Sequence, residues 1–229
     1  MTQLVLADSV SGLYAGETMS SFDGVVSGIN GKSRRDFLVV NSGNVDGDAQ
    51  ADPKHHGGND RVLHHFPREH YGQYRRWDMM TGFKDAPAMG ENISTVGVDE
   101  SMVNIGDVVQ IGDVVLQVTQ PRSPCFKLNK QFGHPEFALA MQTSSLCGWF
   151  YRVLTPGHIH QGDSIVRVER HSDISVKQAM SIYFSTEFNE AEYQRLLTAE
   201  GLAVSWRQSL AKRLDSRKIE NWKIRLFGV

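Results

Sequence analysis

The chain has 229 residues, of which 40% are hydrophobic and 22% charged, a balance typical of globular proteins that bury a core. No apolar stretch approaches the roughly 18 residues of a membrane span, and the N-terminus lacks the basic start and apolar run of a signal peptide. Only two cysteines occur, Cys125 and Cys147. This count argues against a disulfide-stapled secreted domain and, without a CxxC pair, against a structural zinc knuckle. We therefore expect a cytoplasmic protein with no membrane partner.

The charge is unevenly distributed. The whole chain has 24 basic and 26 acidic residues, a net charge of −2. Residues 205–229 hold seven basic and two acidic side chains and carry +5, so the rest of the chain carries −7. A basic C-terminal segment can dock an anionic partner or can simply be a solvated helix face. The acidic remainder argues against a nucleic-acid binder.

Short strand patterns punctuated by glycine dominate the first two thirds of the chain. Residues 37–40 and 62–66 have the length and composition of strands. Pro67 can occupy the first turn of a helix over residues 68–77, because proline lacks only an N–H that is unpaired there in any case. The pattern so far is typical of a mainly β protein with added helices.

The clearest predicted hairpin covers residues 107–118. Two β-branched runs flank Gly112-Asp113, and glycine tolerates the positive φ of a tight turn. Further on, Pro135 can start a helix over residues 136–154, and Gly162-Asp163 precedes a last predicted strand over residues 164–168. The segment after Glu169 lacks β patterns.

Three short helices are predicted in this last segment, each from capping residues. The signals are, in chain order, a capping box at Ser175 and Gln178, a cap at Asn189, a stop at Gly201 and a second capping box at Ser205 and Gln208. We therefore expect two domains, a mainly β domain over residues 1–169 and a small three-helix domain over residues 170–229.

Cys125 is the first candidate for chemistry. It lies in Gln120-Pro121-Arg122-Ser123-Pro124-Cys125-Phe126-Lys127, where two prolines exclude a regular helix and stiffen a loop. Arg122 and Lys127 can approach its sulfur and favour the thiolate, the form that binds a soft metal or attacks an electrophile. An inert, half-buried thiol between structural prolines is the alternative. Cys147 lies in an apolar stretch that reads as helical, where cysteine acts as a small hydrophobe.

Five of the nine histidines fall between His55 and His70. A zinc site is one interpretation, but adjacent strand residues point to opposite faces, so His64 and His65 do not easily share a ligand shell. Gly57-Gly58 with Arg61 can form a cradle for an anionic group, because free N–H groups and a guanidinium both favour phosphate. A purely structural role for the histidines stays open.

Asn92 stands in a third polar segment, Gly90-Glu91-Asn92-Ile93-Ser94. Its amide offers a donor and an acceptor, which suits the edge of a heterocycle. The same composition is also that of an ordinary loop, and both interpretations remain.

Taken in order, these segments resemble the MOSC family, the molybdenum-cofactor sulfurase C-terminal type domain. The C-terminal part is similar to the three-helix domain of one bacterial subgroup, the 6-N-hydroxylaminopurine resistance proteins. The motifs that carry the resemblance are Gly47-Asp48, His56-Gly57-Gly58-x-Asp60-Arg61, His65-x-Pro67-Arg68-Glu69-His70-Tyr71, Gly90-Glu91-Asn92-Ile93-Ser94, Gln120 to Cys125 with Lys127-Leu128-Asn129, Gly148-Trp149, and Ser172-Asp173 through Ser205-Trp206 to Lys218-Ile219-Glu220.

The resemblance implies a MOSC-type β-barrel with short helices, and a cleft that holds the molybdenum cofactor (molybdopterin) with a cysteine thiolate on the metal. Cys125 matches that ligand. The other positions that match the surroundings of the pterin, its phosphate or the substrate are His56, Arg61, His65, Asn92, Arg122, Ser123 and Lys127. His55 and His64 fall outside the shared pattern.

The resemblance implies an oxidoreductase that reduces N-hydroxylated compounds such as 6-N-hydroxylaminopurine and so detoxifies base analogues. Cys125 would be the catalytic metal ligand, and His65 a candidate proton donor. The sequence has no GxGxxG fingerprint and no cysteine set for an iron–sulfur cluster, so a separate electron-donor protein is expected. The alternatives are a carrier that binds the cofactor without turnover and a sulfur carrier that forms a persulfide on Cys125.

Overall fold

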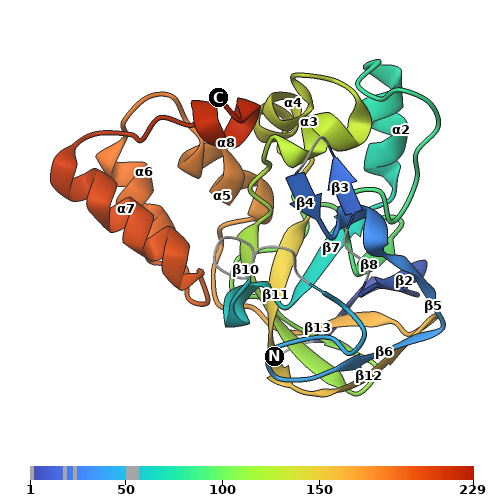
Figure 1. The fold of residues 1–229 in the computed structure, drawn as a ribbon. Coiled ribbons are helices and arrows are strands. Elements are labelled where there is room, and N and C mark those ends of the chain that lie inside the picture. Colours follow the sequence, from blue (N-terminus) through green and yellow to red (C-terminus); the bar gives the residue numbers. More distant parts are fainter. Residues whose placement is uncertain (1–2, 18–19, 23–24, 50–56) are drawn as a thin grey trace.

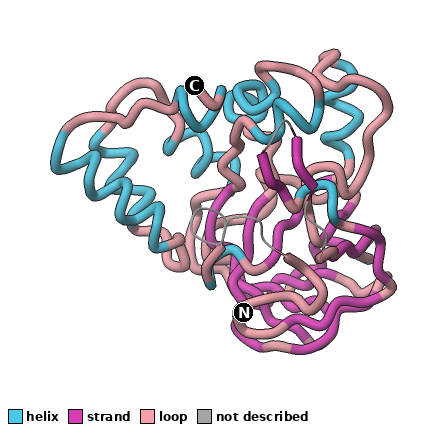
Figure 2. Tube along the Cα trace, viewed as in Figure 1, coloured by secondary structure: helices cyan, strands magenta, loops and turns pink. Residues whose placement is uncertain are grey.

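A computed structural model describes residues 3–17, 20–22, 25–49 and 57–229. Its centre is a curled nine-stranded sheet that forms a half-barrel, with helices gathered mainly on one side (Figures 1 and 2). The strands are, in spatial order, β1 (Leu4–Ala7), β13 (Ile165–Glu169), β9 (Val108–Ile111), β10 (Val114–Pro121), β11 (Trp149–Thr155), β7 (Leu63–Pro67), β8 (Ile93–Thr95), β2 (Gly12–Ala15) and β5 (Ser33–Arg35). Neighbours pair antiparallel except β7 and β8, which are parallel.

Two smaller sheets flank the half-barrel. They pair β12 (Gly157–His160) with β6 (Phe37–Val40), and β3 (Ser20–Phe22) with β4 (Val25–Ser27). The remaining elements of the first domain are the 3₁₀ helices η1 (Ile29–Gly31) and η2 (Asn59–Arg61) and the α-helices α2 (Glu69–Arg76), α3 (Lys127–Phe132) and α4 (Phe137–Ser144). None of the helices in the described residues combines the length and apolar composition needed to cross a bilayer.

The strongest local patterns predict their elements correctly. The hairpin over residues 107–118 is β9 and β10, joined at Gly112-Asp113, where Gly112 has φ +57°. The predicted helix after Pro67 is α2, and the strand predictions at 37–40, 62–66 and 164–168 correspond to β6, β7 and β13. Each element is specified by residues within its own span or directly beside it.

The predicted helix over residues 136–154 is wrong in its second half. The helix α4 ends at Ser144, and residues 149–155 form β11, which pairs with β10 on one side and β7 on the other. Gly148 has φ +68°, and a Cβ there would lie 2.2 Å from the carbonyl oxygen of His65, so only glycine fits the turn into the strand. A short apolar run satisfies helix and strand periodicity alike, and sheet pairing decides between them.

The C-terminal segment holds the three predicted helices, α5 (Val176–Tyr183), α6 (Glu190–Leu197) and α7 (Val204–Ser216), and a further short helix, α8 (Lys223–Phe227). The capping box at Ser175 and Gln178 is confirmed, and so is the cap at Asn189. The predicted capping box at Ser205 is wrong, because α7 already begins at Val204 and the Val204 N–H donates to the Asp60 carboxylate at 2.8 Å. A side chain of the first domain therefore caps this helix.

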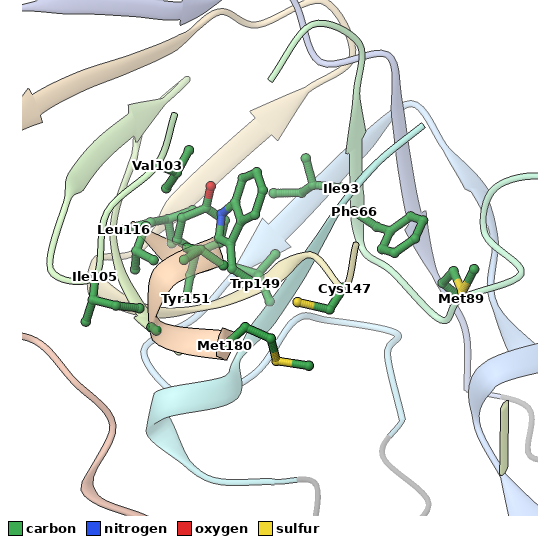
Figure 3. Packing of buried hydrophobic residues seen from close by; sticks show 14 of the residues in the cluster. Phe66, Met89, Ile93, Val103, Ile105, Leu116, Cys147, Trp149, Tyr151 and Met180 are labelled. Carbon is green, nitrogen blue, oxygen red and sulfur yellow. The ribbon is translucent and has the colours of Figure 1, made fainter. Parts of the chain in front are cut away.

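One continuous core joins the half-barrel to the C-terminal helices. Trp149, Leu116 and Ile93 of the sheet belong to the same buried cluster as Val176 and Met180 of α5. Figure 3 shows Met180 on its helix among the sticks of this cluster, together with Cys147, Trp149 and Tyr151. The helices thus share the hydrophobic core of the sheet.

Candidate functional site

A pocket with about 730 Å³ of empty space, part of it open to solvent, lies where the ends of several sheet strands meet loops from other parts of the chain. Five of the residues selected from the sequence line it: Arg61, Asn92, Arg122, Cys125 and Lys127. They come from η2, the start of β8, the loop after β10 and the first turn of α3. The fold therefore gathers these five residues into one cavity, although Arg61 and Lys127 are 66 positions apart in the sequence.

Cys125 follows the buried Pro124 on the loop that leads from β10 into α3. Its thiol is half-buried, and its carbonyl accepts the Leu128 N–H at 2.9 Å, which fixes the entry into the helix. Arg122 lies buried nearby. Burial lowers the pKa of Arg122, while the adjacent Cys125 opposes that shift. The loop thus presents a thiol to the pocket beside a buried guanidinium.

Arg61 of η2 also lines the pocket. The turn begins at Gly58, whose φ of +103° is accessible mainly to glycine. The Asp60 carbonyl accepts the Thr119 hydroxyl of β10 at 2.6 Å, which ties η2 to the central sheet. Burial lowers the pKa of Arg61, although Asp60 opposes the shift.

The amide of Asn92 is engaged by the protein itself. Its Oδ1 accepts the His64 N–H at 3.0 Å, and its Nδ2 donates to the Tyr14 carbonyl at 3.2 Å and to Asp48 Oδ2 at 2.9 Å. These bonds connect β7, β2 and the loop at Asp48. Asn92 lines the pocket, but its contacts indicate that it holds the wall together rather than reading the edge of a heterocycle.

Lys32 and Asp48 form a buried ion pair that also lines the pocket and that the sequence reasoning did not select. Their N–O distance is 2.6 Å, and the two side chains are only 8% and 7% exposed. Burial lowers the pKa of Lys32, and Asp48 opposes this shift. Asp48 belongs to Gly47-Asp48, one of the motifs that resemble the MOSC family, so the sequence pointed to it. Lys32 lies in none of these motifs.

His64, not His65, reaches the pocket from β7. His64 is 4% exposed and its ring lies 4.9 Å from that of Phe150. Burial and the neighbouring Arg122 hold its pKa well below 6.5, so its imidazole is neutral at neutral pH.

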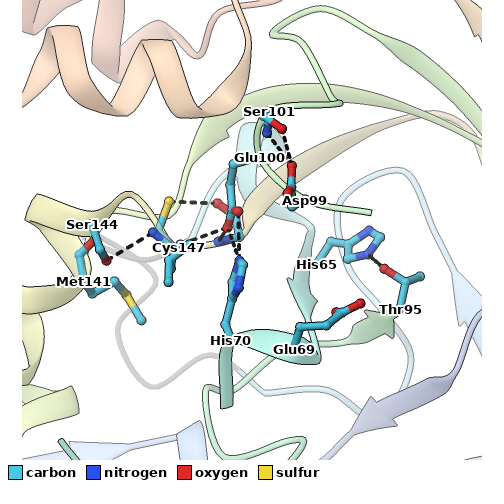
Figure 4. Close-up of polar contacts among 12 residues, drawn as sticks. His65, Glu69, His70, Thr95, Asp99, Glu100, Ser101, Met141, Ser144 and Cys147 are labelled. Atoms are coloured by element: carbon cyan, nitrogen blue, oxygen red, sulfur yellow. Dashed lines mark hydrogen bonds and ion pairs between the residues drawn. The ribbon is translucent and has the colours of Figure 1, made fainter. Parts of the chain in front are cut away.

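The expected place of His65 at the site is corrected, because strand alternation turns it into the core. Its side chain is fully buried, Nε2 lies 2.7 Å from the Thr95 hydroxyl (Figure 4), and Nδ1 lies 3.0 Å from the Tyr151 hydroxyl. Burial lowers its pKa to about 3. With both ring nitrogens engaged away from the pocket, His65 is not placed to donate a proton there, and we replace it by His64 in the candidate site.

Ser123 and Cys147 do not line this pocket. Ser123 is half-buried and is not among the described residues that line the pocket. His55 and His56 lie outside the described residues. Cys147 is fully buried, as its apolar surroundings predict, and its N–H donates to Glu100 at 2.9 Å (Figure 4).

The lining is rich in cations. Lys32, Arg61, Arg122 and Lys127 meet a single described lining carboxylate, that of Asp48. Directly behind this lining, Glu91 is fully buried, and desolvation raises its pKa to about 7. A thiol next to several cations in a partly enclosed pocket suits an anionic ligand that offers a soft metal.

Comparison with known proteins agrees with this geometry. Residues 52–166 match the family model described as the MOSC domain, and residues 174–217 match the model described as the YiiM-like 3-alpha helix domain. Protein YiiM of Escherichia coli (strain K12) is 40% identical over 217 residues, which are 94% of this chain and 97% of that protein.

The crystal structure of YiiM from Escherichia coli superposes with a TM-score of 0.80 at 35% sequence identity, covering 96% of this chain and 99% of that one. A protein named "Reductase" from Gibberella moniliformis is 38% identical over 117 residues, which are 50% of this chain but only 21% of the fungal protein. On these matches the chain belongs to the MOSC-domain family, and it carries the YiiM-like three-helix domain after the MOSC domain.

Proposed function

We propose that this protein is a molybdenum-cofactor-dependent reductase that removes the hydroxyl group from N-hydroxylated compounds such as 6-N-hydroxylaminopurine. The observation that carries the proposal is the opening of the Cys125 thiol into the same pocket as Arg61, Arg122 and Lys127. Membership of the MOSC family and the partial match to a fungal protein named a reductase support an oxidoreductase.

The residues of the pocket fit this cofactor. Molybdenum favours soft sulfur ligands, and Cys125 is the one thiol among the described lining residues. The pterin of the cofactor ends in a phosphate, for which guanidinium and ammonium groups are the usual protein partners. Cys125 would hold the metal, and Arg61, Arg122 and Lys127 would hold the anionic pterin.

When bound, the cofactor supplies two-electron redox chemistry at the metal. The overall reaction balances as R–NH–OH plus two electrons and two protons, giving R–NH₂ and water. The N–O bond breaks, and the oxygen leaves as water. Because the chain has only two cysteines and no dinucleotide fingerprint, we propose that the electrons come from a separate donor protein.

His64 would orient the substrate by a hydrogen bond rather than act as the proton donor. Its imidazole is neutral, and Nε2 lies 3.5 Å from the Cys147 carbonyl, so Nε2 carries the N–H and Nδ1 would accept a hydrogen bond from the substrate. The pocket is partly open to solvent, which can deliver the two protons. Replacing His64 with alanine is therefore expected to raise the KM more than it lowers the kcat.

The test uses protein produced in a host that makes the cofactor, a chemical reductant, and 6-N-hydroxylaminopurine, with adenine measured by chromatography. Wild-type protein should form adenine, and Cys125→Ser should not. Cys147→Ser is the matched control and should keep the activity, because Cys147 is sealed in the core. If the loaded wild-type protein leaves the analogue unchanged, the reductase is refuted and a carrier of the cofactor becomes the better account.

A further inference from the structure

The loop that presents Cys125 is held from outside the MOSC domain. Between the end of β10 and the start of α3, the Phe126 N–H donates to the carbonyl of Arg225 in α8 at 2.8 Å. The Arg225 guanidinium donates to the Pro124 carbonyl. Both neighbours of Cys125 in the chain are thus hydrogen-bonded to Arg225, which follows Cys125 by 100 positions.

The helix α8 is itself anchored to this region. Leu226 is 5% exposed, and its carbonyl accepts Asn129 Nδ2 of α3 at 2.8 Å. Gly228, with φ +78°, lies against the Phe126 ring so closely that an added Cβ would stand 3.1 Å from it. Figure 1 shows α8 beside α3 and α4, apart from α6 and α7. The last helix therefore joins the Cys125 loop to the end of α5, where Phe184 contacts both Arg225 and Trp222.

The Arg225 guanidinium is held between the Cys125 loop, α4 and the end of α5, and it lies 4.5 Å from the centre of the Phe184 ring. Its guanidinium is half-buried, and its bonds go to two neutral oxygens, those of Pro124 and of Gln142 Oε1 at 2.5 Å. None of the ion pairs between described residues includes Arg225. Burial lowers the pKa of Arg225 to about 10, which leaves it charged at neutral pH, and Cys125 is the first of the groups that oppose this shift.

We infer that Arg225 is a positioning residue of the candidate site, which holds the Cys125 loop in place from α8. The inference rests on the proposed function in taking Cys125 as the metal ligand. It gives the C-terminal segment a role at the pocket: α8 reaches back across the domain boundary to complete the support of the thiol.

The test compares full-length Arg225→Gln with Arg217→Gln. Arg217 lies in the same C-terminal domain, bonds Glu190 and contacts the Phe188 ring, but is not bonded to the loop. The first measurement is hydrogen–deuterium exchange of peptides that cover residues 123–130. A lost hydrogen bond from a charged donor should weaken their protection by about tenfold or more in Arg225→Gln and not in Arg217→Gln.

The second measurement is molybdenum content after production in a host that makes the cofactor. Arg225→Gln should retain less metal than Arg217→Gln. Unchanged loop protection together with unchanged metal content in Arg225→Gln overturns the inference. If wild-type protein takes up no molybdenum, the proposed function fails, and the exchange result alone then decides whether Arg225 holds the loop.

Arg225→Lys covers the case in which the glutamine variant does not fold. Lysine keeps the charge but cannot bridge the Pro124 carbonyl and Gln142 as a planar guanidinium does. It should therefore lose loop protection as the glutamine variant does. Wild-type protection of residues 123–130 in Arg225→Lys would also contradict the inference.

Discussion

Two adjacent histidines of β7 show how strongly one backbone step separates their environments. His64 faces the pocket beside Arg122, whereas His65 lies between Thr95 and Tyr151 in the core. Both imidazoles are buried, and burial lowers both pKa values below the ordinary 6.5. As the pH falls below that value, both histidines become protonated in the unfolded chain, whereas they stay neutral in the folded protein.

This exclusion predicts a pH dependence of stability. Since the unfolded state binds a proton at His65 near pH 6.5 and the folded state binds it only near pH 3, the free energy of unfolding should fall as the pH drops through this window. The contribution of His65 is about 1.4 kcal/mol per pH unit. Urea unfolding between about pH 6 and pH 4 should show this loss in wild-type protein and a shallower slope in His65→Gln.

The control for that experiment is His158→Gln, which removes a solvent-exposed imidazole. Parallel slopes for wild-type protein and His65→Gln would show that the buried ring is not the source of the pH dependence. The difference between slopes is the useful quantity, because Glu91, whose pKa burial raises to about 7, acts in the opposite direction in both proteins.

Part of the pocket could be predicted from the residues of one proline-containing loop. Cys125 between two prolines, with Arg122 before it and Lys127 after it, points to a cationic thiol site, and all three line the pocket. Lys32 could not be predicted, because a lone lysine carries no sign of its burial. For β7, the alternation of strand residues implies that only one of His64 and His65 faces the site, but does not say which one.

At the scale of elements, the ends of helices depend on distant residues. The capping box of α5 is local and was predictable, whereas α7 begins against Asp60, 144 positions away from Val204. The same carboxylate pairs with Arg152 of β11 at 2.8 Å. Asp60 thus joins η2, which carries Arg61, to the sheet and to the C-terminal domain.

Replacing Asp60 with alanine should lower the free energy of unfolding by about 1–2 kcal/mol, as the loss of a helix cap does. Asp60→Asn keeps an oxygen that can accept the Val204 N–H, and should lose less. Asp113→Ala is the control, because that side chain is 75% exposed. Urea titration measures all three, and equal stability of Asp60→Ala and Asp113→Ala would contradict the capping role.

At the scale of the whole molecule, the two family domains share one core, and the helix that follows them contacts the Cys125 loop. Met180 of α5 packs in the same buried cluster as Trp149 of the sheet, and α8 supports the Cys125 loop through Arg225. Composition and turn patterns predicted a mainly β domain followed by helices, but not this return of the chain. Such long-range packing has no local pattern in the sequence, since it depends on how the elements meet.

The central claim is that Cys125 binds molybdenum within this pocket. The most direct measurement is elemental analysis of protein purified from a host that makes the cofactor, with wild type, Cys125→Ser and Cys147→Ser compared side by side. The account predicts molybdenum in wild type and in Cys147→Ser and its loss in a folded Cys125→Ser protein. Molybdenum retained at the wild-type level by Cys125→Ser would contradict it.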